Sequence, residues 1–300
     1  MRRLFALAAA LLAALAPEAA AQEIALTFDD LPAHDPLPPG ETHLGVNRAL
    51  LKALKEAEAP ATGFVNGART QGDPSAAQVL GLWRKAGHPL GNHTWSHRRL
   101  TAADAGAFTD ELVRNEALLR PLGPGWRWFR YPYLAEGETP AVRAWARQLL
   151  ARRGYRVASV TLDFSDWAYN APYARCRAKG DAAAIAALED RFMAAAAKSL
   201  AQSRALSRRL YGREIPLVLL MHAGAFSARM APRLLDFFES QGLRFVSLDQ
   251  AQADPFYRPD LEAQASSEPL TLENAARARG LEVPQGPTTA GLDQVCAETP

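Results

Sequence analysis

One short stretch near the start of the chain decides the fold: Ile24-Ala25-Leu26-Thr27-Phe28-Asp29-Asp30-Leu31-Pro32. Its mostly apolar run ends abruptly in two adjacent carboxylates, which is typical of a buried strand that opens into a loop. Two neighbouring carboxylates repel each other, so either solvent or a bound cation has to stabilise them. A metal ion would neutralise one carboxylate and leave the other free to act as a base.

Length and composition limit the kinds of protein this chain can be. It has 300 residues, is 48% apolar and carries a formal net charge of +2. A chain of this length can form one large domain or two small ones. Because it contains no basic block of five or six residues, the sequence gives no indication of nucleic-acid binding.

Residues 1–21 have the pattern of a secretory signal peptide. Arg2 and Arg3 precede an apolar run, and the small residues 19–21 provide a cleavage site before Gln22. The apolar run of about 13 residues is short for a membrane span, although an uncleaved anchor is the alternative. We therefore expect an exported mature chain, periplasmic or secreted, with no membrane span of its own.

The two cysteines, Cys176 and Cys296, lie far apart in the sequence. An even number of cysteines in an exported chain permits one disulfide, which here would tie the C-terminal tail to the body of the protein. Two unpaired, buried thiols are the alternative.

Strand-like stretches alternate with helical ones along most of the chain. The strand-like stretches are 24–28, 61–66, 89–92, 126–131, 155–162, 217–221 and 243–248. The stretches with helical periodicity are 46–57, 75–86, 101–120, 139–153, 181–210 and 230–241. Roughly seven strands that alternate with helices indicate a parallel α/β architecture. Beyond Pro255 the pattern weakens into a polar tail.

A polar cluster follows each of five predicted strands. These clusters are Asp29 with Asp30, His93 with His97, Arg130, Asp166 and His222. A barrel brings the C-terminal ends of its strands onto one rim, whereas a doubly wound sheet gathers them around one crevice. Clusters after five different strands favour a distorted (β/α)7-8 barrel over residues 22–255, with the active site at the C-terminal strand ends. Residues 256–300 would form an extension that packs on the barrel or trails from it.

The spacing of the histidines indicates a metal site. His93 and His97 stand four positions apart, which on a helical turn places both imidazoles on one face. With one Asp they would form an N,N,O ligand set that leaves coordination positions open, as a catalytic zinc-type site needs. Arg130 could keep the second Asp ionised as a base. His222 could act as a general acid, with Asp166 tuning its pKa.

Five motifs, in order, resemble those of the polysaccharide deacetylases of carbohydrate esterase family four, the NodB-homology domain. They are Thr27-Phe28-Asp29-Asp30, His93-Thr94-Trp95-Ser96-His97, Arg130-Tyr131-Pro132-Tyr133, Asp163-Phe164-Ser165-Asp166-Trp167 and Leu220-Met221-His222. The resemblance covers about residues 24–250. It implies a distorted barrel with one divalent metal ion, usually zinc.

The resemblance also implies a role for each motif residue. Asp29 would be the base, oriented by Arg130, and the metal ligands would be Asp30, His93 and His97.

The remaining implied roles concern the substrate. The backbone N–H of Tyr133 would help to bind the oxyanion, and His222 would be the acid with Asp166 as its tuning partner. Trp167 and Leu220 would line the pocket for the acetyl methyl group.

Three functional hypotheses follow from these residues. The first is a metal-dependent hydrolase that removes acetyl groups from N-acetylated polysaccharide or oligosaccharide. The second keeps this machinery but acts on a small non-sugar amide or an O-acetyl ester. The third is a non-catalytic carbohydrate-binding relative, against which the intact base, ligands and acid argue. The residues give no indication of the oligomeric state, and the segment 168–214 and the C-terminal extension have no assigned role.

Three further histidines have no place in the predicted site. His34, His43 and His88 are interpreted as surface residues, since each lies in a loop or at a helix end. His34 follows the Asp pair closely, so it could also face the rim and touch substrate.

Overall fold

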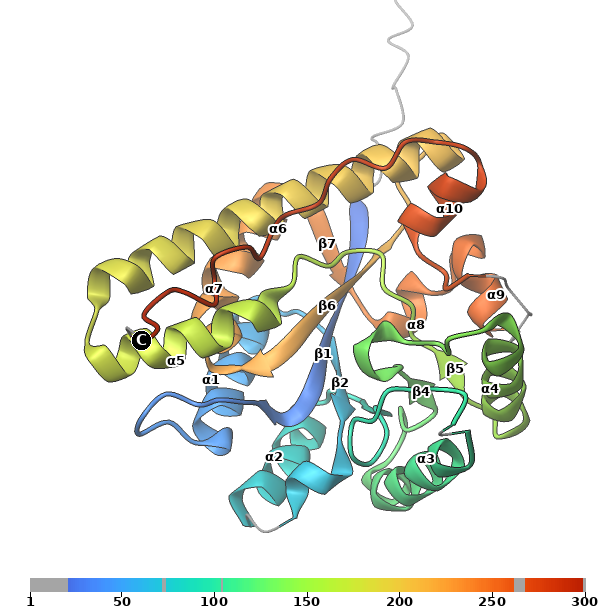
Figure 1. Cartoon of the computed structure of the whole chain (residues 1–300), viewed down its shortest axis with the longest axis horizontal. Coiled ribbons are helices and arrows are strands. Elements are labelled where there is room, and N and C mark those ends of the chain that lie inside the picture. Colours follow the sequence, from blue (N-terminus) through green and yellow to red (C-terminus); the bar gives the residue numbers. More distant parts are fainter. Residues whose placement is uncertain (1–20, 72–73, 104, 262–267, 299–300) are drawn as a thin grey trace, which may run out of the picture.

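The computed structural model describes residues 21–71, 74–103, 105–261 and 268–298, so nearly all of the predicted signal peptide lies outside the described residues. Within these ranges seven parallel strands form one sheet, surrounded by helices (Figure 1). The strands are β1 (Gln22–His34), β2 (Ala61–Val65), β3 (Leu90–Asn92), β4 (Trp128–Phe129), β5 (Arg156–Val157), β6 (Leu217–Gly224) and β7 (Leu243–Val246).

The central strand is β1, which contains the stretch that ends in the two aspartates. The strand order is β5-β4-β3-β2-β1-β6, and β7 pairs with the N-terminal part of β1. Along β1 the side chains are buried almost without interruption, as expected of a parallel strand covered on both faces. Because β1 has neighbours on both edges, its C-terminal end is surrounded by the ends of other strands.

A short irregular segment closes the sheet into a distorted barrel. Val157 pairs with Phe129 of β4, and further along the same segment Leu162 forms a bridge with Leu219 of β6. The backbone N–H groups of Thr161 and Leu162 both donate to Val218 O at 3.1 Å. The predicted α/β barrel is therefore confirmed. The strand predicted over 155–162 forms instead as two separate pieces, since this segment has to cross from β4 to β6.

Helices cover the outside of this barrel. They are α1 (His43–Glu56), α2 (Pro74–Lys85), α3 (Ala105–Leu119), α4 (Pro140–Arg152), α5 (Asn170–Lys179), α6 (Ala182–Tyr211), α7 (Ala225–Ser240), α8 (Leu248–Ala251), α9 (Arg258–Leu261) and α10 (Leu272–Ala278). Side-chain caps start several of them: Thr42 and Thr139 accept from backbone N–H groups in the first turns of α1 and α4. None of the helices in the described ranges is long and apolar enough to cross a bilayer.

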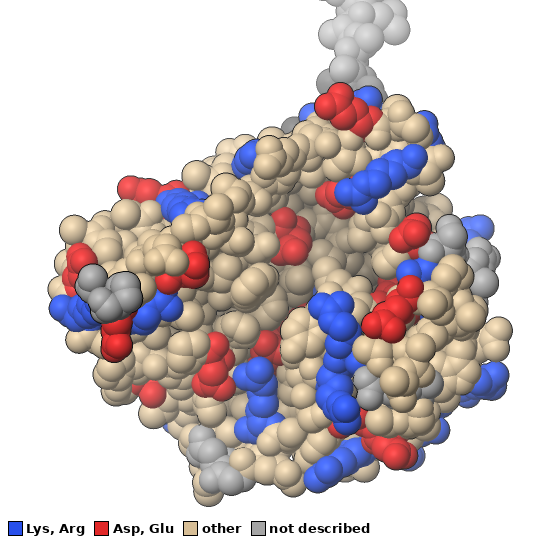
Figure 2. Space-filling view, in the orientation of Figure 1, with Lys and Arg blue, Asp and Glu red and all other residues tan. Residues whose placement is uncertain are grey.

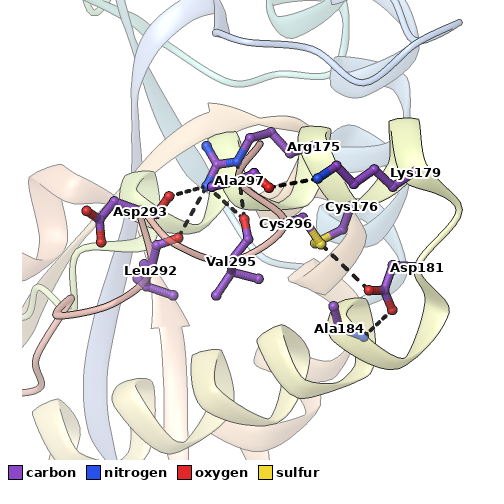
Figure 3. Close-up of a disulfide and its surroundings, with 10 residues drawn as sticks. All are labelled: Arg175, Cys176, Lys179, Asp181, Ala184, Leu292, Asp293, Val295, Cys296 and Ala297. Atoms are coloured by element: carbon purple, nitrogen blue, oxygen red, sulfur yellow. Dashed lines mark hydrogen bonds between the residues drawn. A yellow bond between two sulfur atoms is a disulfide. The ribbon is translucent and has the colours of Figure 1, made fainter. Parts of the chain in front are cut away.

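The C-terminal extension is bound to α5 and α6. Figure 1 shows it (dark red) running back along α6 towards α5. From α6, Arg191 donates to the carbonyl oxygens of Thr288 and Ala290, and Lys198 donates to Gly286 O. The two cysteines form a disulfide that joins α5 to the end of the extension (Figure 3). The question of bridged or unpaired thiols is thus answered in favour of the bridge.

Buried charges fix the strand segment beside the site. Arg147 of α4 donates to Glu136 at 2.7 Å and to Asp260 of α9 at 2.7 Å, and all three are buried. Asp260 also accepts a hydrogen bond from Ser159. Because Ser159 follows Ala158 directly, this network holds the backbone that contacts Arg130.

Candidate active site

The end of β1 brings both aspartates to one place on the rim. Successive side chains of a regular strand point to opposite faces. Asp30, however, has a φ of 65°, a left-handed conformation that is uncommon for a residue other than glycine. As a result, His93 Nε2 lies 3.6 Å from an Asp29 oxygen and 3.8 Å from an Asp30 oxygen. The strained residue therefore lies where the predicted chemistry needs two convergent carboxylates.

Arg130 is the ion-pair partner of Asp29. Its Nη1 donates to Asp29 Oδ1 at 3.2 Å, and its Nη2 donates to Thr27 Oγ1 at 3.1 Å. Its Nε donates to Ala158 O at 2.6 Å, so donors on three nitrogens fix the guanidinium. The Asp29 side chain is only 4% exposed. A buried carboxylate needs such a charged partner to remain ionised.

Asp30, His93 and His97 form a cluster with one potential ligand atom each. These ligand atoms all lie within 4.8 Å of one another, and His97 Nε2 is 3.4 Å from Asp30 Oδ1. Within the described residues, that buried Oδ1 atom has no hydrogen-bond partner. His93 Nδ1 lies 2.7 Å from Arg130 O and must donate to it, which leaves the Nε2 lone pair directed at the cluster. The residues present therefore fit a divalent metal that accepts nitrogen and oxygen ligands.

The protonation of the cluster suits metal binding. Burial and the neighbouring His93 lower the pKa of His97 to about 4, so its imidazole is neutral near neutral pH. Although burial alone would raise the pKa of Asp30, the hydrogen bond from His34 and the nearby histidines hold it well below its usual range. A neutral imidazole and an ionised carboxylate are the forms that coordinate metals.

His222 and Asp166 form the second polar pair on the rim. His222 Nδ1 lies 2.8 Å from Asp166 Oδ1. Asp166 Oδ2 accepts from His222 N at 2.9 Å and from Ser227 Oγ at 2.6 Å. Burial would lower the pKa of His222, but the Asp166 carboxylate outweighs it and raises the pKa to about 9. Since Nδ1 is engaged by Asp166, Nε2 is the atom that can exchange a proton with substrate.

Two aromatic rings are exposed near these groups. Tyr133 is 59% exposed and its ring centroid lies 4.5 Å from that of His97. Trp167 is 48% exposed and follows Asp166 directly in a 3-10 turn. Leu220 is buried in β6, where it pairs with Thr27 of β1. Tyr133 thus contacts His97 of the cluster, whereas Trp167 and Leu220 are placed through their neighbours in the chain.

The structure corrects the interpretation of two histidines as surface residues. His34 Nδ1 lies 2.6 Å from Asp30 Oδ2, and its ring centroid lies 5.1 Å from that of His222. His88 is 9% exposed and accepts a hydrogen bond from Ala61 N. Asp30 and His34 are four positions apart, as are His93 and His97. This spacing was the sequence feature that could have predicted the contact between His34 and Asp30. His43 is partly exposed, within 3.5 Å of an Asp35 oxygen.

Comparison with known families agrees with this geometry. Residues 16–158 match the polysaccharide deacetylase family. The matched range contains both aspartates, His93, His97 and Arg130. Over this range the chain is similar to the polysaccharide deacetylases. The predicted resemblance is therefore confirmed, and the pair of Asp166 and His222 lies beyond the matched range.

The names of curated relatives of this part of the chain refer to deacetylases of different glycans. A chitin deacetylase from Pestalotiopsis sp is 30% identical over 147 residues, which cover 49% of this chain and 44% of that protein. A peptidoglycan-N-acetylglucosamine deacetylase from Bacillus cereus is 27% identical over 146 residues, 48% of this chain and 47% of that protein. A chitooligosaccharide deacetylase from Rhizobium leguminosarum bv. trifolii is 30% identical over 150 residues, 49% of this chain and 60% of that protein. The chain thus spans less than half the length of the first two relatives.

Solved deacetylase structures share the fold. The T48 deacetylase with substrate has a TM-score of 0.51 and 22% identity, over 84% of this chain and 96% of that chain. The polysaccharide deacetylase Bc1974 from Bacillus cereus has a TM-score of 0.50 and 23% identity, over 75% of this chain and 91% of that chain. A mutant of a family four pseudoenzyme also has a TM-score of 0.51 and is 15% identical. The match covers 77% of this chain and 67% of that chain. Since a pseudoenzyme shares this fold, activity has to be argued from the site residues.

Proposed function

We propose that this protein is a metal-dependent hydrolase that removes acetyl groups from N-acetylated polysaccharide or oligosaccharide. One observation carries the proposal: the two adjacent aspartates have different partners on the same rim. Asp29 is held by Arg130, and Asp30 joins His93 and His97. One carboxylate is thereby available for proton transfer and the other for a metal ion.

The proposed reaction is hydrolysis of an acetamido group. A divalent metal, when held by Asp30, His93 and His97, supplies Lewis acidity to the water and to the amide carbonyl. Asp29, ionised beside Arg130, takes the proton of the water as its oxygen bonds to the carbonyl carbon. The C–N bond then breaks, and the departing amine receives the proton held at His222 Nε2. The products are acetate and a free amine.

Further groups on the rim support the transition state and the substrate. The backbone N–H of Tyr133 is proposed as a donor to the oxyanion, in the manner of an oxyanion hole. Leu220 and Trp167 are proposed to line the acetyl methyl pocket. The exposed rings of Tyr133 and Trp167 also fit the apolar face of a pyranose. Exposed rings favour an extended glycan over a small amide, and the names of the curated relatives support an N-acetylated sugar.

We also propose that the chain is exported, to the periplasm or outside the cell. Residues 1–21 have the pattern of a signal peptide, and a disulfide such as Cys176–Cys296 persists in oxidising compartments. Residues 22–255 would then be the catalytic barrel and 256–300 its extension.

Acetate release from a panel of substrates tests the proposed function. The panel contains chito-oligosaccharides, peptidoglycan fragments, acetylated xylan and a small N-acetyl amide. We expect acetate from an N-acetylated glycan, loss of release with a chelator, and recovery when zinc is added back. Release from xylan alone would support an O-acetyl esterase. Release from no substrate would support the non-catalytic alternative.

A further inference from the structure

A cavity of about 280 Å³ lies beside the candidate active site. One wall contains Leu134, which follows Tyr133, and Asp163 and Ser165, which precede Asp166. The opposite wall comes from α6 and the C-terminal extension, through Gln202 and Glu273 among others. In Figure 2 a hollow lies beneath α6 in the middle of this face, and acidic side chains are visible inside it. The cavity therefore shares a loop with the proposed acid pair.

The lining of this cavity is acidic and contains a buried acceptor atom with no partner among the described residues. It includes two carboxylates, Asp163 and Glu273, and no cationic side chain among the described residues that form it. Asp163 Oδ1 accepts from Ser165 N at 2.7 Å, and Glu273 Oε1 accepts from Gln202 Nε2 at 3.5 Å. Gln202 Oε1 is buried, and within the described residues it has no hydrogen-bond partner. A ligand that brings several donors and a positive charge would satisfy these acceptors.

Neither of these two carboxylates forms an ion pair with a described residue. By contrast, Glu189 of α6 pairs with both Arg229 and Arg233 of α7. An unpaired carboxylate in a concave site is stabilised when a cation binds there. A carboxylated sugar would be repelled by the same two groups.

We propose that this cavity is a sugar subsite that binds a hexosamine with a free ammonium group, next to the N-acetylated unit that is hydrolysed. This inference rests on the proposed deacetylase function, because the product of that reaction carries the required amine. The α6 and extension walls lie outside residues 16–158, the range that matches the family. The subsite favours glycans that are already partly deacetylated, and the first cleavage on a glycan promotes the next.

Direct binding of a glucosamine trisaccharide tests the subsite independently of turnover. The probe has three free amines and no acetyl group, so the metal-loaded full chain cannot hydrolyse it. Glu273→Gln keeps the size of the side chain and removes its charge. Loss of one charged hydrogen bond weakens binding by about tenfold, measured by calorimetry in slightly acidic buffer. Glu282→Gln is the matched control, because Glu282 is an exposed residue of the same extension and should bind like wild type.

A kinetic comparison of two tetrasaccharides and a binding test with tri-lysine complete the experiment. On a tetrasaccharide with one N-acetyl unit flanked by glucosamine, kcat/KM of Glu273→Gln should fall about tenfold more than on the fully acetylated tetrasaccharide. Equal binding of the trisaccharide by wild type and Glu273→Gln, or no binding by wild type, would overturn the subsite. Equally strong binding of tri-lysine would also overturn it, since charge alone would suffice. Expected binding without acetate release from any substrate would contradict the proposed function and leave the subsite in place.

Discussion

At the scale of single residues, the site depends on two neighbouring carboxylates that have different partners. Asp29 lies 3.2 Å from a guanidinium nitrogen of Arg130. Asp30 accepts from His34 on one oxygen, and its other oxygen lies near His97 with no hydrogen-bond partner among the described residues. Carboxylates whose surroundings differ in this way commonly divide acid–base work from charge stabilisation. We therefore expect a change at Asp29 to affect proton transfer and to spare metal binding.

The first prediction concerns the base. Asp29→Asn preserves the shape of the side chain but cannot take a proton, so kcat should fall by about 10²–10⁴-fold. Metal content should not change, because Asp29 is not among the proposed ligands. Acetate release and elemental analysis of the same preparation measure both quantities. Asp190→Asn is the control, since its side chain is 82% exposed on α6. A near-normal rate in Asp29→Asn would exclude the proposed role.

The second prediction concerns the pH dependence of the acid. Because Asp166 raises the pKa of His222 to about 9 against the effect of burial, His222 is protonated below that pH and loses its proton above it. The value of kcat/KM should therefore fall as the pH rises through about 9. Asp166→Asn removes the carboxylate charge, so this alkaline limb should move to lower pH.

A pH profile of kcat/KM for both proteins measures the shift. Ser227→Ala serves as a comparison, because it removes only one hydrogen bond to Asp166 and should move the limb less. An alkaline limb that stays in place in Asp166→Asn would contradict the assignment of His222 as the acid.

Which residues could be found from sequence depended on their position relative to strands. Asp29, His93 and Arg130 each follow an apolar stretch, and their convergence followed from the parallel barrel. His34 was interpreted as a surface residue because its contact depends on how the loop after the aspartates turns back. The left-handed backbone conformation of Tyr133 could not be predicted either, since nothing in the local sequence pattern requires it.

At the scale of elements, long periodic patterns were predictable and short pairings were not. The helix predicted over 181–210 occurs as α6, Ala182–Tyr211. The strand predicted over 155–162 splits, because its two partners, β4 and β6, come from distant parts of the chain. The periodicity of a local stretch of sequence predicts a helix, whereas the pairing of a strand depends on residues in distant parts of the chain.

The C-terminal extension gives the prediction at this scale. The disulfide Cys176–Cys296 joins it to α5, and Arg175 of α5 also donates to Val295 O at 2.9 Å (Figure 3). Cys296→Ser should lower the free energy of unfolding by about 2–4 kcal/mol, because the unfolded chain loses a cross-link. Cys296 is the better position to change, since Cys176 is fully buried in the core.

Urea unfolding measures the loss of stability, and limited proteolysis shows whether the extension is released. Wild type treated with a reducing agent should match the variant in both measurements. Unchanged stability in Cys296→Ser would mean that the hydrogen bonds of Arg175, Arg191 and Lys198 are sufficient to hold the extension.

At the scale of the whole molecule, the site exists only once the barrel is closed. Asp30 comes from the end of β1, His93 and His97 from the loop after β3, and His222 from β6. The family match ends at residue 158, so the proposed acid and its partner depend on the second half of the chain. Binding of one metal ion should therefore stabilise the entire fold, because it links segments that only the native barrel brings together.

The last prediction follows from this linkage. Saturating zinc should raise Tm, and a chelator should lower it, since a ligand that binds only the native state at a hundred times its Kd adds about 2.7 kcal/mol. His97→Ala removes one of the three proposed ligands and should lose most of the chelator-dependent change in Tm. Asp29→Asn should keep that change, because it alters the base and spares the ligands. Scanning calorimetry measures all three proteins. An equal chelator effect in wild type and His97→Ala would place the metal elsewhere in the molecule.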